Sequence, residues 1–145
     1  MTIDSWNSSE VIDHFSLTPL DREGGYFAPV HGDAFGNSIY FLMTVTQFSG
    51  WHRLSEPETW TLLAGADIAL YVKADTYQQV SLSRREGRLS HTVEASEWMA
   101  AETLGEWSLI LCTLAPPFSG MELATLDDVT TWQLRDPSIR RLIHE

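Results

Sequence analysis

A succession of short apolar segments, each closed by a turn signal, dominates the middle of this 145-residue sequence. The segment 38–48 (SIYFLMTVTQF) is rich in aromatic and β-branched residues and is apolar at both alternating positions. That pattern predicts a strand covered on both faces. Shorter segments of the same kind follow at 60–64, 68–72, 78–83, 91–93 and 107–114. Short strands at a spacing of roughly 8–12 residues, separated by turns, are typical of a β-sandwich or barrel rather than of βαβ units.

Helix signals stand at both ends of the chain. Asn7 and Glu10 have the spacing of a capping box, and so do Thr125 and Asp128. Asp136 precedes a proline, a residue favoured at the first position of a helix. We therefore predict one all-β domain with short helical ends, over the following ranges: the domain at 1–145, its barrel at about 24–118, and its helical ends at about 8–16 and 125–144.

The charge balance is strongly acidic, with 20 Asp and Glu against 9 Lys and Arg. This argues against a nucleic-acid partner, which requires many cationic contacts to phosphate, and against an anionic membrane surface. Cys112 is the single cysteine, so the chain can form neither an internal disulfide nor a cysteine metal cluster. No signal peptide or membrane-spanning stretch is recognisable, and a cytoplasmic location is expected.

The residues best suited to catalysis or ligand binding lie in the segment 51–60 (WHRLSEPETW). His52 precedes a tight turn and Glu58 begins the returning strand, so a barrel can direct both side chains into one interior. A neutral imidazole and a carboxylate that share a pocket can act as metal ligands or as an acid/base pair.

This segment resembles the first motif of the cupins, G-x5-H-x-H-x3-4-E-x6-G. His52, Glu58 and Gly65 match it, whereas Leu54 stands for the second histidine and Thr46 for the opening glycine. The second motif, G-x5-P-x-G-x2-H-x3-N, corresponds to 87–103 only in outline. Its proline, glycine and histidine are replaced, in that order, by Glu94, Ser96 and Met99.

An ordered series of segments resembles the cupin_5 (DUF985) family more closely. The series comprises 23–27 (EGGYF), 39–42 (IYFL), 51–53 (WHR), Glu58 with Trp60, Gly65, 107–109 (WSL) and 112–116 (CTLAP). The resemblance implies a dimeric cupin jelly-roll barrel, or double-stranded β-helix, of the kind described as sugar-epimerase-like. The sequence departs from the family pattern at Thr61, Tyr71 and Met99, where relatives often carry two histidines and a glutamine.

The motif positions supply two metal ligands, fewer than the three protein ligands of a usual catalytic zinc site. We therefore expect no cofactor, and a metal-independent cupin that binds a small polar molecule such as a sugar derivative. If it is an epimerase or isomerase, His52 is the expected acid or base and Glu58 its partner. The epimerase-like resemblance adds a tyrosine acid on the opposite face, for which Tyr40 and Tyr71 are the candidates.

Four further residues are expected to contact a ligand. Trp60 alternates in phase with Glu58 and should point into the barrel. Arg53 can anchor an anionic ligand, although a regular strand turns it away from the pocket. Glu23 lies beside a double glycine at the expected pocket mouth, and Met99 occupies a motif histidine position.

Two alternatives stay open: a non-catalytic ligand-binding cupin, and a metal-dependent oxygenase or isomerase with the metal at His52 and Glu58. A homodimer is expected through the barrel strands, because the apolar segment 38–48 offers a face that needs covering.

Overall fold

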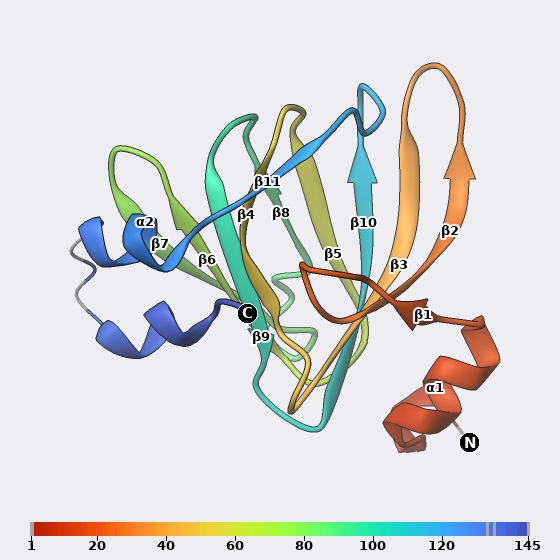
Figure 1. Ribbon diagram of the computed structural model, residues 1–145. Coiled ribbons are helices and arrows are strands. Elements are labelled where there is room, and N and C mark those ends of the chain that lie inside the picture. The colour runs from red at the N-terminus through yellow and green to blue at the C-terminus, as the bar shows by residue number, and fades with distance from the viewer. Residues whose placement is uncertain (1, 133, 135, 145) are drawn as a thin grey trace.

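Two antiparallel sheets form a barrel in the computed structural model, which describes residues 2–132, 134 and 136–144 (Figure 1). The first sheet has the order β1 (Thr18–Pro19), β2 (Tyr26–Gly32), β3 (Asn37–Thr44), β10 (Trp107–Leu114), β5 (Glu58–Gly65) and β8 (Ser90–Val93). The second has the order β11 (Met121–Leu123), β4 (Ser49–Leu54), β9 (Trp98–Thr103), β6 (Ile68–Lys73) and β7 (Tyr77–Leu82). The predicted all-β cupin barrel is confirmed.

The helical ends cover the outside of the barrel. A 3-10 turn, η1 (Ile3–Ser5), leads into α1 (Ser8–Phe15), and α1 begins with the predicted capping box between Asn7 and Glu10. The second predicted capping box begins α2 (Leu126–Thr131), and the proline segment forms a 3-10 helix, η2 (Pro137–Arg141). The segment that carries α2 and η2 packs against the outer face of the second sheet (Figure 1).

Strand β3 shows why the segment 38–48 is apolar at alternating positions. Phe41 and Met43 point into the barrel, whereas Leu42 and Tyr40 lie on the outer face with the side chains of α1. The Tyr40 ring lies 4.8 Å from that of Phe15, measured between centroids. The strand ends at Thr44, four residues earlier than the composition suggests, because Thr44 and Gln47 close a turn with paired backbone hydrogen bonds.

Strand β9 was not among the predicted strands. Its sequence, WMAAET, contains two alanines, which have low β propensity. It forms because it is paired on both sides, with β4 and with β6. Ala101 packs into the barrel and Ala100 against the C-terminal segment, so the small side chains fit a sheet that is crowded on both faces.

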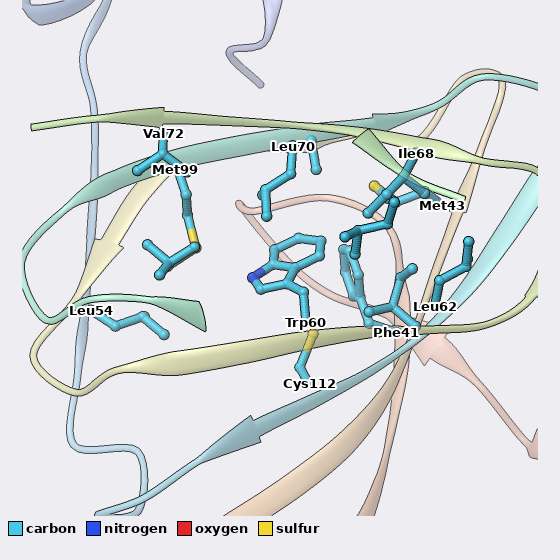
Figure 2. Packing of buried hydrophobic residues seen from close by; sticks show 14 of the residues in the cluster. Phe41, Met43, Leu54, Trp60, Leu62, Ile68, Leu70, Val72, Met99 and Cys112 are labelled. Atoms are coloured by element: carbon cyan, nitrogen blue, oxygen red, sulfur yellow. The ribbon is translucent and has the colours of Figure 1, made fainter. Parts of the chain in front are cut away.

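The barrel interior is filled by apolar side chains from both sheets. Trp60 lies at the centre of this cluster, with Cys112 beside it on β10 (Figure 2). Both are almost completely inaccessible to solvent. Trp60 therefore lies inside the barrel, as its alternation with Glu58 predicts.

Candidate functional site

A cavity of about 190 Å³ opens at one end of the barrel. Several strands of both sheets start or stop there, so their terminal side chains converge. Asn37 and Glu58 are the first residues of β3 and β5, and Leu54 and Leu114 are the last of β4 and β10. The other lining residues are Leu20, Glu23, Phe27, Ile39, Phe118 and Met121.

Glu58 presents a buried carboxyl group to this cavity. The residue is 6% exposed, and the indole N–H of Trp60 donates to its Oε1 at 2.9 Å. Among the described residues, no protein group donates to Oε2. One oxygen is thus held by the barrel core and the other is available to a ligand.

Glu23 reaches the same cavity from the loop between β1 and β2. This loop is compact because Gly24 N–H donates to the carbonyl of Leu20, and Gly24 has the positive φ of 97° that such a turn requires. The Glu23 side chain is 12% exposed, and Ser49 Oγ donates to its Oε2 at 3.2 Å. Its other oxygen, Oε1, lies 3.4 Å from His52 Nε2.

His52 is buried behind Glu23, with 1% exposure. Its Nδ1 lies 2.7 Å from the carbonyl oxygen of Gly50. A carbonyl can only accept, so Nδ1 carries the hydrogen, and in the neutral ring Nε2 carries a lone pair. That lone pair faces Glu23 Oε1. When Glu23 is ionised, two acceptors face each other, whereas a protonated Glu23 can donate to Nε2.

Burial governs the titration of all three groups. It raises the pKa of Glu23 to about 7, and the hydrogen bond from Ser49 only partly opposes this. It also raises the pKa of Glu58 to about 7, where nearby His52 acts to lower it and the charge of Glu23 to raise it further. Burial lowers the pKa of His52. At neutral pH the imidazole is therefore uncharged, and the two carboxyl groups share about one proton between them.

The structure does not bring either tyrosine to the cavity, which corrects the expectation of a tyrosine acid. Tyr71 lies on the outer face of β6, where its hydroxyl donates to Glu102 Oε2 at 2.7 Å. Tyr40 lies under α1 on the outer face of β3. Each alternates with residues that fill the barrel, so strand periodicity directs each outward.

Arg53 also points away from the cavity. Its guanidinium pairs with Glu122, with the two nearest atoms 2.7 Å apart, and lies 4.5 Å from the centre of the Trp98 ring. Met99 is paired with His52 between β4 and β9 and is packed into the barrel core. Met99 and Trp60 thus belong to the barrel core and are not among the residues that line the cavity.

Sequence reasoning missed two residues that shape the cavity mouth. Glu56 is 6% exposed and accepts from the backbone N–H of Ser119 at 2.9 Å and from its hydroxyl. Asn37 Oδ1 accepts from the backbone N–H of Phe118 at 2.7 Å. These bonds fix the loop that carries Phe118. The sequence holds no signal for them, because both partners meet only after folding.

The donor set does not fit the metal that cupin motifs generally imply. Leu54 and Met99 occupy two motif positions for imidazole ligands, and both are core residues. Nowhere in 2–132, 134 and 136–144 do three or more His, Cys, Asp or Glu side chains form a group that could hold a metal ion. The proposed chemistry therefore uses side chains alone.

The fold is a cupin barrel with a small cavity at one end. The family model described as "Cupin superfamily (DUF985)" matches residues 9–125, and the chain belongs to that family. None of the curated proteins matches the chain. In the part of the chain that the structure describes, no helix is long and apolar enough to cross a membrane.

Solved structures of similar fold agree with this assignment. A hypothetical protein from Leishmania major superposes with a TM-score of 0.85 at 23% identity, covering 97% of this chain and 100% of that one. A protein from Shewanella oneidensis superposes with a TM-score of 0.81 at 22% identity, covering 97% of this chain and 98% of that one. A cupin 2 conserved barrel domain protein from Rhodopseudomonas palustris superposes with a TM-score of 0.65 at 14% identity, covering 89% of this chain and 90% of that one. At these identities the likeness establishes the fold.

Proposed function

We propose that this cupin binds a small carbonyl compound and moves a proton at the carbon next to the carbonyl group. One observation carries the proposal: Glu23 and Glu58 line the same largely apolar cavity, and burial raises the pKa of each to about 7. A carboxylate base and a neutral carboxylic acid can therefore coexist in one site at neutral pH. Acid–base catalysis is most effective when the pKa of the acting group lies near the working pH.

The contacts favour Glu58 as the base. The indole N–H of Trp60 donates to Glu58, and such a bond stabilises the ionised form of a carboxyl group. Its Oε2 receives no hydrogen bond from the described residues, so it can take a proton from a substrate carbon.

Glu23 is then the acid, with His52 as its positioning residue. The lone pair on His52 Nε2 favours the protonated form of Glu23. The 3.4 Å distance between Glu23 Oε1 and His52 Nε2 is longer than a good hydrogen bond, so the Glu23 proton can also be donated to a substrate oxygen. This revises the sequence-based role of His52, because its side chain stands behind Glu23 and does not line the cavity.

The proposed step conserves atoms and charge. Glu58 Oε2 takes the proton from the carbon, and the C–H electron pair becomes a carbon–carbon double bond. The carbonyl π pair moves to oxygen, which takes the proton held by Glu23. The products are an enol, a protonated Glu58 and an ionised Glu23. Return of the proton from Glu58 to the same carbon, with the enol O–H proton returning to Glu23, regenerates the carbonyl compound, and in D₂O a deuteron takes the place of the α-proton.

Epimerisation of a sugar derivative is the narrower form of this function that the family resemblance suggests. It requires a second proton-transfer group on the opposite face of the substrate. Tyr40 and Tyr71 lie outside the barrel, so they do not support this role. A proton shift on one face needs only the two carboxyl groups.

Hydrogen–deuterium exchange tests the proposal directly. A panel of small carbonyl compounds, including phenylacetone and dihydroxyacetone, is incubated in D₂O, and loss of the α-proton signal is followed by ¹H NMR. We expect wild type to accelerate exchange for at least one compound, and Glu58→Gln to abolish the acceleration. Glu122→Gln, which changes an exposed glutamate, is the matched control and should retain it. Exchange no faster than buffer for the whole panel, or unchanged in Glu58→Gln, contradicts the proposal.

A non-catalytic binding protein is the second candidate, favoured by the apolar residues at motif positions 54 and 99. It predicts a ligand that binds in the cavity and is recovered unchanged, with no exchange in D₂O.

We also propose that two copies pair through the outer face of the first sheet. Helix α1 already covers the outer face of the segment 38–48 at Tyr40 and Leu42, so that segment is not the pairing face expected from the sequence. The open part of the face lies on β10 and β5, where Leu111 is half-buried and Leu63 is 38% exposed. Light scattering at micromolar concentration should give the dimer mass, and Leu63→Lys should shift it towards monomer. A monomeric wild type would exclude this pairing.

A further inference from the structure

We infer that the substrate is an uncharged, largely apolar carbonyl compound of about 8–10 non-hydrogen atoms, and not a sugar. This inference rests on the proposed proton transfer and names the class of molecule that the same cavity selects. It is carried by the wall chemistry, the volume and the charge of the cavity.

The wall of the cavity cannot satisfy a polyol. Seven of its ten lining residues are apolar: Leu20, Phe27, Ile39, Leu54, Leu114, Phe118 and Met121. The polar groups are the carboxyls of Glu23 and Glu58 and the amide of Asn37, whose oxygen already accepts from Phe118. Each sugar hydroxyl placed against the apolar wall would lose its water partners and gain no protein partner in return.

The volume sets the size of the apolar body. A dry apolar cavity of about 150 Å³ binds benzene, a molecule of six non-hydrogen atoms. The cavity here is about 190 Å³. It therefore has room for a six-membered ring with a short carbonyl-bearing branch.

The charge of the site repels anions, and its apolar wall disfavours a buried cation. Two carboxyl groups repel a phosphate or a carboxylate, and no lysine or arginine is among the described residues that line the cavity. Arg53 is held on the outer surface by Glu122. An ammonium group could pair with an ionised carboxylate, but its other N–H groups would lie unsatisfied against the apolar wall, and it offers no acceptor to the proton on Glu23. A carbonyl oxygen accepts that proton without bringing a charge into the cavity.

A small phenol tests the class, because 4-methylphenol has the planar ring and hydroxyl of an enol and eight non-hydrogen atoms. Its dissociation constant is measured by NMR titration at pH 7 on wild type, beside glucose, benzoate and benzylamine. We expect saturable binding of 4-methylphenol only. Ile39→Phe, which fills the cavity, should weaken it at least tenfold. Val30→Phe, an equal substitution at an exposed position of the same sheet, should leave it unchanged.

The outcomes separate the substrate class from the reaction. The inferred class is overturned if glucose, benzoate or benzylamine binds with equal or greater affinity than 4-methylphenol. It is also overturned if Ile39→Phe binds 4-methylphenol as tightly as wild type does, provided that both variants have the melting temperature of wild type. Deuterium exchange on dihydroxyacetone but not phenylacetone also overturns the class and leaves the proton transfer standing. Specific phenol binding without exchange on any compound leaves the class standing and refutes the reaction.

Discussion

Replacing Glu58 by glutamine should change how the stability of the protein depends on pH. In the folded protein the pKa of Glu58 is raised to about 7 by burial, whereas a glutamate in the unfolded chain titrates near 4.5. Unfolding between these pH values releases a proton, so the free energy of unfolding falls as the pH rises from 4.5 to 7. Glutamine cannot ionise, and the variant loses this contribution.

The expected size follows from the two pKa values. A pKa of about 7 against 4.5 corresponds to about 3 kcal/mol. The stability of Glu58→Gln relative to wild type should therefore rise by about that amount between pH 4.5 and pH 8. For a domain of this length the relative change in Tm is about 10 °C.

The difference between variants is the informative quantity, because His52 acts in the opposite direction. Its pKa is lowered in the folded state, so below pH 6.5 the unfolded chain takes up a proton that the folded protein refuses. That contribution makes wild type more stable as the pH rises and partly masks the carboxyl contribution.

Urea unfolding followed by tryptophan fluorescence, at half-unit pH steps from 4.5 to 8, supplies the measurement. Glu122→Gln is the control, because its carboxylate is exposed and pairs with Arg53 on the surface. A Glu58→Gln curve that stays parallel to wild type throughout would refute the raised pKa of Glu58 and, with it, the proposed base.

Three further perturbations test how the site is held. Gly24→Ala should lower the free energy of unfolding by about 2 kcal/mol or more, since its Cβ would clash with the backbone carbonyl oxygen of Phe48 and with His144 Nε2 at a φ of 97°. Gly87→Ala, with open space at a φ of 74°, is the control in urea unfolding, and equal losses would contradict the clash. His52→Ala should slow α-proton exchange and move its pH optimum while the fold survives by circular dichroism, and an unchanged pH profile would remove the role given to His52. Glu56→Ala removes the acceptor of both the backbone N–H and the hydroxyl of Ser119, so it should speed backbone hydrogen exchange at Ser119 by about tenfold, and unchanged protection would show that Glu56 does not fix the loop.

The sequence was sufficient for the barrel because strand periodicity and turn composition are local. The capping boxes at Asn7 and Thr125 were likewise predictable, since all their partners lie within three residues. The motif pair His52 and Glu58 was found for the same reason: one turn joins the strands that carry them.

The rest of the site depends on contacts that sequence order does not reveal. Periodicity shows that Tyr71 and Leu70 face opposite ways, but not which of them faces the barrel, because that depends on register with other strands. Glu23 reaches the cavity through a loop in which Arg22 and Gly24 both have positive φ, a path that composition does not encode. The apolar wall comes from five separate strands and two loops, so its character emerges only with the fold.

Direct titration of the glutamate side chains tests the central claim most closely. With ¹³C-labelled glutamate, the carboxyl resonances are followed by NMR from pH 3 to pH 9 and assigned with Glu23→Gln and Glu58→Gln. We predict that the resonances of Glu23 and Glu58 titrate with midpoints near 7 and shift together. Midpoints below 5 for both would mean that the cavity holds two ordinary carboxylates, and the proposed acid–base pair would not exist.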